Sequence, residues 1–69
     1  MKRYEIRLPY ALSPTLAAAF PEFDALPIAP STTLLTGMLN DQSELQGILA
    51  RIADMGLEIA EVHVRHESS

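Results

Sequence analysis

The chain has 69 residues, 48% of them hydrophobic and 20% charged, with nine acidic side chains against five basic ones and no cysteine. This length allows one small domain, which we place at residues 1–66, and the hydrophobic content is too high for intrinsic disorder. Without cysteine there is neither a disulfide framework nor a thiolate zinc site, which favours the cytoplasm. The acidic balance argues against nucleic-acid binding, and no stretch approaches the roughly 18 apolar residues of a membrane span.

The first segment predicts a strand followed by a short helix. From Lys2 to Leu8 polar and apolar residues alternate, which is the period of a strand with one buried face. Ser13 followed by Pro14 is a helix start, because serine can cap free N–H groups and proline needs none at the first helical position. Pro21 moves Phe20 out of the helical region, so we expect only two turns.

The segment 25–31 fits either an edge strand or an extended loop. Pro27 and Pro30 remove two backbone donors, which a strand tolerates only at the edge of a sheet. Residues 32–38 then have the β-branched and apolar content of a strand. Gly37 in this strand would let a helix lie close against it.

The next segment predicts a long helix. Asp41, with Glu44 three residues later, resembles a capping box ahead of an apolar-periodic run. The apolar residues of that run fall on one stripe at helical spacing: Leu45, Ile48, Leu49, Ile52 and Met55. Glycine is common directly after the end of a helix, so Gly56 indicates that the helix spans about residues 42–55.

The last strand completes a recognisable order of elements. Residues 61–65 alternate again, with Val62 and Val64 toward the core, and we expect the polar tail at 67–69 to fray. The order βαββαβ is the split βαβ arrangement of ferredoxin-like folds. Right-handed crossovers would place the first and third strands in the middle of an antiparallel sheet and both helices on one face. We therefore expect an α+β, ferredoxin-like two-layer sandwich with a short first helix and a long second one.

No group of residues has the composition and spacing of a catalytic, cofactor or metal site. His63 and His66 are the only imidazoles, and residues three apart on a strand point to opposite faces, so they cannot chelate together. The hydroxyls have no expected neighbouring base, and Ser13 and Ser43 already have roles at helix starts. The carboxylates are spread over helix ends and loops, and three isolated glycines form no phosphate-binding loop. We expect no enzyme activity, no cofactor and no bound metal.

The first candidate binding surface is the outer face of the sheet. If the first and last strands pair, they place six polar side chains side by side: Arg3, Glu5, Arg7, Glu61, His63 and Arg65. Leu34 and Thr36 join this face if Leu35 points inward, which gives an apolar spot in a polar rim. A solvated face is the simpler interpretation.

The second candidate surface is the side of the long helix opposite its apolar stripe, which carries Ser43, Gly47, Ala50 and Asp54. A glycine in the middle of an exposed helix costs about 1 kcal/mol relative to alanine. Gly47 therefore suggests the close approach of another backbone, at a position that Ala50 would share. Neutral drift of a surface position is the simpler explanation.

The sequence resembles a family of short actinobacterial proteins that have no established activity. The matching residues cover nearly the whole chain: Tyr4-Glu5-Ile6-Arg7, Leu12-Ser13-Pro14, Thr33-Leu34-Leu35-Thr36-Gly37, Asp41-Gln42 with Leu45, Gly47 and Leu49, and Gly56-Leu57-Glu58. The chain departs from the family pattern around Pro27 and Pro30. The resemblance implies a fold and no catalytic residues.

These features favour a non-enzymatic interaction module that pairs with itself as a homodimer or is the small partner of a larger protein. For so small a core, association would also add stability by mass action. The alternative is a regulatory domain resembling the ACT class, which binds small metabolites at paired domain edges. A glycine-rich loop after the first strand would favour that alternative, and Pro9-Tyr10-Ala11-Leu12 contains no glycine.

Overall fold

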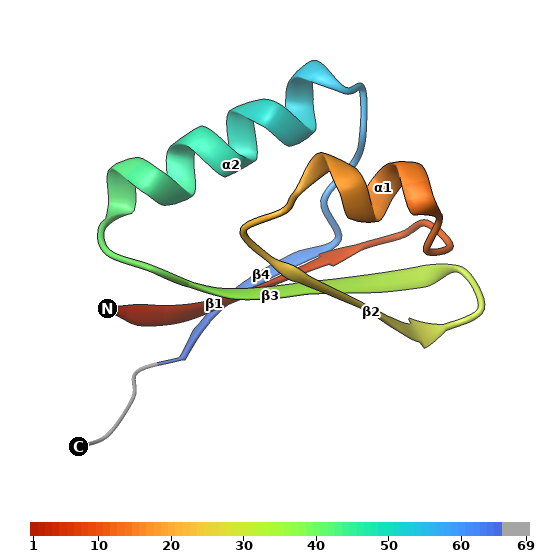
Figure 1. The fold of residues 1–69 in the computed structure, drawn as a ribbon, viewed down its shortest axis with the longest axis horizontal. Coiled ribbons are helices and arrows are strands. Elements are labelled where there is room, and N and C mark those ends of the chain that lie inside the picture. Colours follow the sequence, from red (N-terminus) through yellow and green to blue (C-terminus); the bar gives the residue numbers. More distant parts are fainter. Residues whose placement is uncertain (66–69) are drawn as a thin grey trace.

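The computed structural model describes residues 1–65, and its six elements follow the order expected from the sequence (Figure 1). They are β1 (Lys2–Leu8), α1 (Pro14–Ala19), β2 (Asp24–Ala29), β3 (Thr32–Leu39), α2 (Gln42–Asp54) and β4 (Glu61–Arg65). His66 and the tail predicted to fray at 67–69 lie outside the described residues.

The four strands form one antiparallel sheet in the order β2-β3-β1-β4. The prediction that the first and third strands are central is therefore confirmed. Both helices cover the same face of this sheet, so the molecule has an α layer and a β layer (Figure 1). The opposite face, which we call the outer face, carries neither of the two helices of residues 1–65. None of the helices in residues 1–65 is long and apolar enough to cross a membrane.

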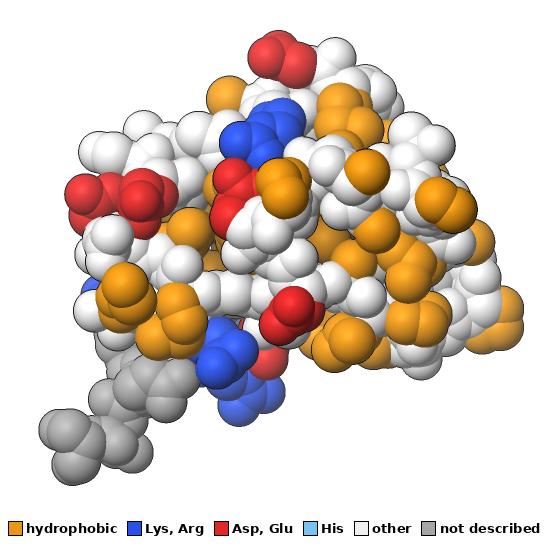
Figure 2. All heavy atoms as spheres, viewed as in Figure 1, with side chains coloured by type: hydrophobic (Ala, Val, Ile, Leu, Met, Phe, Trp, Pro, Cys, Tyr) orange, Lys and Arg blue, Asp and Glu red, His pale blue; other side chains and the backbone are white. Residues whose placement is uncertain are grey.

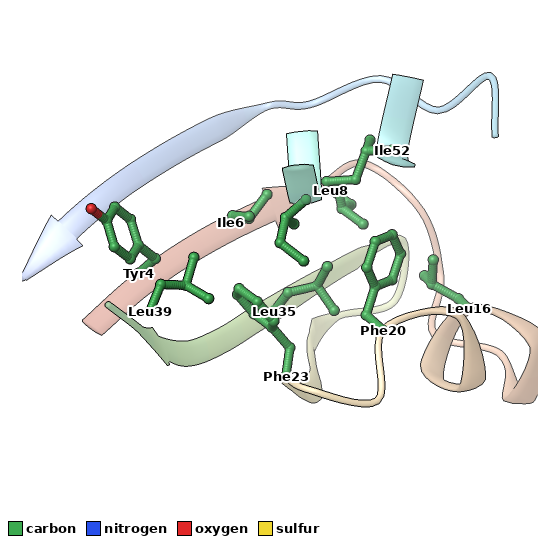
Figure 3. Close-up of a cluster of buried hydrophobic side chains, with 10 residues drawn as sticks. Tyr4, Ile6, Leu8, Leu16, Phe20, Phe23, Leu35, Leu39 and Ile52 are labelled. Atoms are coloured by element: carbon green, nitrogen blue, oxygen red, sulfur yellow. The ribbon is translucent and has the colours of Figure 1, made fainter. Parts of the chain in front are cut away.

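The core lies between the sheet and the two helices. Its buried side chains come from both central strands, both helices and the segment after α1: Tyr4, Ile6, Leu8, Leu16, Phe20, Phe23, Leu35, Leu39, Ile48 and Ile52. Figure 3 shows Phe20 directed toward the strands that carry Leu8 and Leu35. Ile6 and Leu35 are cross-strand neighbours. Because side chains alternate between the two faces of a strand, every second residue of β1 and of β3 points toward this core.

The proline-rich segment is a strand rather than a loop. β2 begins at Asp24 and pairs with β3, and Pro27 lies within it at the edge of the sheet. The register shifts between Pro27 and Ala29, which is the signature of a β-bulge. Among the described strands β2 has a neighbour on one side only, so the backbone donors on its other side have no strand to pair with. Pro27, which lacks a donor, is therefore compatible with this edge position.

Helix α1 is two turns long, as predicted. The Ser13 hydroxyl accepts a hydrogen bond from the Leu16 N–H at 3.1 Å, and Pro14 occupies the start of the helix. The helix ends at Ala19, with Phe20 as its C-cap residue and Pro21 directly after it. Phe23, which follows α1 at helical spacing in the sequence, lies beyond the helix but still reaches the core.

Helix α2 is capped at both ends by local interactions. Asp41 Oδ1 accepts the Glu44 N–H at 3.0 Å, as the capping-box pattern predicts. The Glu44 carboxylate, however, returns to the N–H of Asn40 and not to that of Asp41. At the other end Gly56 has φ 74° and donates to the Ala53 carbonyl, which is half of a Schellman motif.

The second half of that motif fixes the exit from α2. The Leu57 N–H donates to the Ile52 carbonyl at 3.2 Å. The expected burial of Met55 on the apolar stripe is wrong, because Met55 is the C-cap residue and its side chain is exposed. It lies where the chain is already turning away from the core.

Two further expectations about packing are corrected by the structure. Val62 and Val64 lie on the helix-bearing face, opposite Ile6 and Tyr4, but they stay 39% and 42% exposed because the helices do not cover β4. Gly37 allows a close approach, although not by a helix. A Cβ at Gly37 would lie 3.2 Å from the Glu22 carbonyl oxygen and 3.3 Å from the Phe23 ring, both in the segment that joins α1 to β2.

Candidate functional site

The outer face of the sheet brings together the polar side chains predicted to lie there. Glu5 is directly opposite His63, and Arg7 is directly opposite Glu61, in the antiparallel pairing of β1 with β4. Arg65 completes the set on β4. The two ends of the chain therefore build this half of the outer face together.

These side chains are connected by ion pairs across the two strands. Arg7 Nη1 lies 3.1 Å from Glu61 Oε2, and Arg65 Nε donates to Glu5 Oε1 at 2.9 Å. His63 Nε2 lies 3.1 Å from the same Glu61 Oε2. Glu61 therefore receives two contacts on one oxygen.

Two members of these ion pairs, Glu61 and Arg65, have shifted pKa values. The hydrogen bond from His63 and the positive charge of Arg7 hold the pKa of Glu61 below its ordinary value. The Glu5 carboxylate raises the pKa of Arg65 through its hydrogen bond and its negative charge. Both groups are open to solvent, so these pairs contribute more to the order of the surface than to the stability of the fold.

The other half of the outer face is mainly apolar. Leu35 points inward, so Leu34 and Thr36 join the outer face as predicted. Leu34 pairs with Leu26 of β2, which is 47% exposed. Thr36 is nearly buried, and its Oγ1 accepts a hydrogen bond from Arg3 Nη1 at 3.4 Å. Leu26 was not among the residues expected here, because its strand was uncertain.

The charge of the molecule is divided unequally between its two sides. On the outer face three arginines are balanced by three carboxylates: Arg3, Arg7 and Arg65 against Glu5, Asp24 and Glu61. The remaining described residues have five carboxylates and two basic side chains, a formal charge of −3: Glu22, Asp41, Glu44, Asp54 and Glu58 against Lys2 and Arg51. Figure 2 shows acidic side chains spread over α2 and apolar ones gathered around α1 and the β2–β3 hairpin.

The exposed side of α2 gives no support for a close contact at Gly47. A Cβ built at Gly47 meets no atom of residues 1–65 within 4 Å, so no other backbone in this part of the chain approaches it. Ala50 is exposed on the same helix. Within residues 1–65 no neighbouring backbone accounts for Gly47, and the approach of another molecule to this side of α2 stays a prediction.

Shallow hollows among the described residues include the following three. One of about 320 Å³ lies between β1, β4 and the start of α2, beside Lys2, Tyr4 and Val64. A second, of about 310 Å³, lies beside Gly47 between α2, the end of β3 and the α1–β2 connection. The third, of about 230 Å³, lies between the ends of the two helices and is almost entirely apolar.

Titratable side chains do not gather in these hollows as a metal site would require. Within residues 1–65 there is no group of three or more histidine, aspartate or glutamate side chains placed to hold an ion. His63 lies on the outer face beside Glu61. The question of a pair with His66 falls outside the described residues.

Sequence reasoning missed two residues that hold the elements together. The Tyr10 hydroxyl accepts the Glu58 N–H at 2.8 Å, and the Tyr10 carbonyl accepts the Thr33 hydroxyl at 2.8 Å. Arg51 donates to both carboxylate oxygens of Glu22, at 2.9 and 3.2 Å, and lowers its pKa. Both residues act across long sequence separations, so no local pattern could have identified them.

Comparison with known protein families gives one match. Residues 3–63 match the family described as Domain of unknown function (DUF8691), and the match runs from β1 into β4. The chain belongs to this family. No curated protein and no solved structure matches it.

Proposed function

We propose that this DUF8691 member is a cytoplasmic, non-enzymatic protein-interaction module that binds a second copy of itself or a larger protein through its outer sheet face. The observation that carries the proposal is the division of that face. Leu26 and Leu34 form an apolar part on β2 and β3, next to the ion-paired side chains of β1 and β4. An apolar centre beside a polar rim is the common composition of a protein interface.

The ion pairs support binding because they are already formed in the single chain. Arg7 and Glu61 lie 3.1 Å apart, and Arg65 and Glu5 lie 2.9 Å apart. A partner would meet charges that are partly neutralised and held in fixed positions. Such a surface costs less to desolvate than isolated charges, and it selects partners of matching charge pattern.

The uneven distribution of charge favours contact through the sheet over contact through the helices. The outer face has no formal net charge, whereas the rest of the described surface carries −3. Two copies that met through their helical sides would bring like charges together. Two copies that met through their sheets would keep those charges apart.

The test is to replace Leu34 by lysine and to measure the mass of the protein by native mass spectrometry and analytical ultracentrifugation. Leu34 is half-buried at the surface, so Leu34→Lys should leave the fold intact. We expect it to weaken association, or binding to a captured partner, at least tenfold. The control is Ala50→Lys on the exposed side of α2, which should leave association unchanged. Equal masses for Leu34→Lys and the parent protein would rule out the outer face.

We also propose that the fold is ferredoxin-like. The element order, the strand order β2-β3-β1-β4 and the placement of both helices on one face support this kinship. An experimental structure would test it. A left-handed connection from β1 through α1 to β2 would contradict it.

A second candidate function is the sensing of a small metabolite, as in domains of the ACT class. The hollow of about 320 Å³ beside Tyr4 and Val64 favours it, because the hollow opens next to an edge of the sheet and has the size of a small ligand. Native mass spectrometry of protein purified from its own host distinguishes the two functions. A small additional mass that persists in the monomer would support sensing, and a dimer without it would support the interaction module.

A further inference from the structure

Strand β4 has a free edge that is regular along its whole length. β1 occupies one side of β4, and within residues 1–65 no strand pairs with the other side. Its five residues pair with β1 in an unbroken register from Arg7–Glu61 to Arg3–Arg65. It contains neither proline nor a bulge, so its outer backbone groups are arranged as a second strand would need them.

The sequence of this strand is complementary to itself in the antiparallel direction. Glu61, Val62, His63, Val64 and Arg65 read as acid, valine, imidazole, valine and base. If two copies of β4 are placed antiparallel with His63 at the centre, Glu61 lies opposite Arg65 of the second copy. Val62 then lies opposite Val64 of the second copy, on the side of the sheet where both valines are exposed.

The side chains have the atoms free for these new contacts. Both contacts of Glu61 within residues 1–65 are made by Oε2, which leaves Oε1 for a further donor. Among the contacts within residues 1–65, Arg65 uses Nε for Glu5, and its two terminal nitrogens can serve a further acceptor. The ion pairs of one copy can therefore continue into the next without being broken.

Other registers use less of the strand. A shift by two residues in either direction leaves three of the five residues opposite one another and separates Glu61 from Arg65 of the second copy. A shift by one residue places outward side chains opposite inward ones. A parallel arrangement would bring Glu61 beside its own counterpart. The register centred on His63 is the one that pairs every residue of β4 and both opposite charges.

We propose that two copies of this chain join through β4, antiparallel and centred on His63, and so form one continuous eight-stranded sheet. The two-fold axis is perpendicular to the sheet, so the helices of both copies lie on one side and the outer faces on the other. The proposal rests on the self-association named above but uses the edge of the sheet and not the apolar part of its face. Its consequence is a doubled outer face that offers two equivalent sites to a further partner.

The interface is small. Five residues on each side bury less area than a standard protein interface, partly compensated by backbone hydrogen bonds along the strand. We therefore expect a dimer that dissociates in the micromolar range or above. Measurements should cover micromolar to millimolar protein concentrations.

The decisive experiment exchanges the charges at the two ends of β4. In Glu61→Arg, arginine meets Arg65 of the second copy at two symmetric places, and in Arg65→Glu, glutamate meets Glu61 twice. Each variant alone should dissociate at least tenfold more readily than the parent, in sedimentation equilibrium. A mixture of the two restores both opposite pairs and should form a heterodimer with the affinity of the parent. Changes within one chain cannot produce this rescue, because mixing does not alter them.

A cross-link tests the register. The chain has no cysteine, so the single replacement His63→Cys can form a disulfide only between two copies. At the centre of the proposed pairing the two Cβ atoms are close enough for that bond. The control is Ile28→Cys on the other edge, which is also exposed. We expect covalent dimers from His63→Cys under mild oxidation and few from Ile28→Cys.

The outcomes separate this proposal from the outer-face proposal. If Leu34→Lys keeps the dimer and the charge variants lose it and recover it on mixing, β4 is the site of pairing. If Leu34→Lys abolishes the dimer and the mixture shows no rescue, the β4 proposal is wrong and the outer-face proposal stands. A parent protein that remains a monomer at millimolar concentration overturns the β4 proposal, while binding of a larger protein to the outer face is then tested by Leu34→Lys alone.

Discussion

The two edges of the sheet differ in how open they are to another strand. β2 contains Pro27, which lacks a backbone donor, and a bulge immediately after it. β4 is uninterrupted and alternates regularly from Glu61 to Arg65. Natural proteins protect edge strands with proline, bulges and inward-pointing charges, so β2 is protected, whereas β4, whose charges point outward, is available. The difference indicates that the sequence permits strand pairing with another molecule at β4 and opposes it at β2.

The edges also differ in what covers their inner side. Ala25 of β2 packs against the core, whereas Val62 and Val64 of β4 are exposed on the same side of the sheet. The helices therefore lie over β3 and β1 and leave β4 at the margin.

The largest effect is expected at the centre of the sheet. Ile6 is fully buried, and its cross-strand neighbour Val62 is 39% exposed. Ile6→Asp buries an unpaired charge and should cost more than about 4 kcal/mol, enough to unfold so small a domain. Val62→Asp should cost less than about 1 kcal/mol, because aspartate at that position remains hydrated. Urea denaturation measures both.

The same reasoning applies to the helical side of the core. Ile52 of α2 is also fully buried, so Ile52→Asp should unfold the domain as Ile6→Asp does. A soluble protein that carries both changes and still melts cooperatively would show that the core has been assigned to the wrong residues.

The next effect concerns the protection of β2. Pro27→Val supplies the missing backbone donor and a residue that favours strands. With both edges available, each copy could pair with two others, and the copies would form open assemblies that continue to grow instead of a closed dimer. We expect larger species in sedimentation velocity that grow with concentration. A size distribution identical to that of the parent would mean that Pro27 does not protect this edge.

A smaller effect is expected from a charged residue that blocks strand pairing at the free edge of β4. A lysine on the inner side of an edge strand opposes pairing, because its charge would be buried by the second strand. Val64→Lys should therefore yield a monomer whose thermal stability is close to that of the parent. The matched change on the other edge is Ile28→Lys, at a residue of similar exposure, which should keep the dimer. Dimer loss in both variants would show that the two edges are equivalent.

The smallest effect concerns Glu61 and acid. The pKa of Glu61 is lowered in the folded state by His63 and Arg7, so the ionised form stabilises the fold. This contribution is fully present above the pKa of about 4.3 that glutamate has in an unfolded chain, and it is lost as the pH falls through the lower folded value. Glu61→Gln should therefore lose a little stability at neutral pH and show a slightly weaker dependence on pH in the acid range. Thermal melts from neutral pH down to about pH 3 measure both.

The comparison with Glu22 serves as the control for this last effect. Glu22 has its pKa lowered by Arg51, away from β4. Glu22→Gln should change the acid dependence in the same direction without changing self-association. A change in dimer mass for Glu22→Gln would argue against β4 as the place of pairing.

Local sequence was sufficient wherever a short pattern determines the structure. The start of α2 follows from Asp41 and Glu44, and its end follows from Gly56, because caps depend on residues within one turn. The alternation in β1 and β4 gave the composition of the outer face, since side chains of a strand take opposite faces in turn. The ion pairs of that face then follow from the register.

The remaining features depend on contacts between distant segments. Pro27 is compatible with an edge strand and with a loop, and only the pairing of β2 with β3 decides between them. The exposure of Val62 and Val64 depends on where α2 lies across the sheet, which no alternation in β4 can specify. Leu26 and Tyr10 were missed for the same reason, because their partners lie elsewhere in the chain.

The position of β1 between β3 and β4 has a consequence for the order of folding. Ile6 pairs with Leu35 at a sequence separation of 29 and with Val62 at a separation of 56. Doubling the loop length costs only about 0.6 kcal/mol of closure entropy, but β4 also gains little from the helices, which do not cover it. The hairpin β2–β3 and its pairing with β1 can therefore form first, and β4 joins a sheet that is already assembled. Amide protons of β4 should accordingly exchange with solvent when β4 alone detaches from the sheet. Those of β1 and β3 should exchange only when the whole domain unfolds.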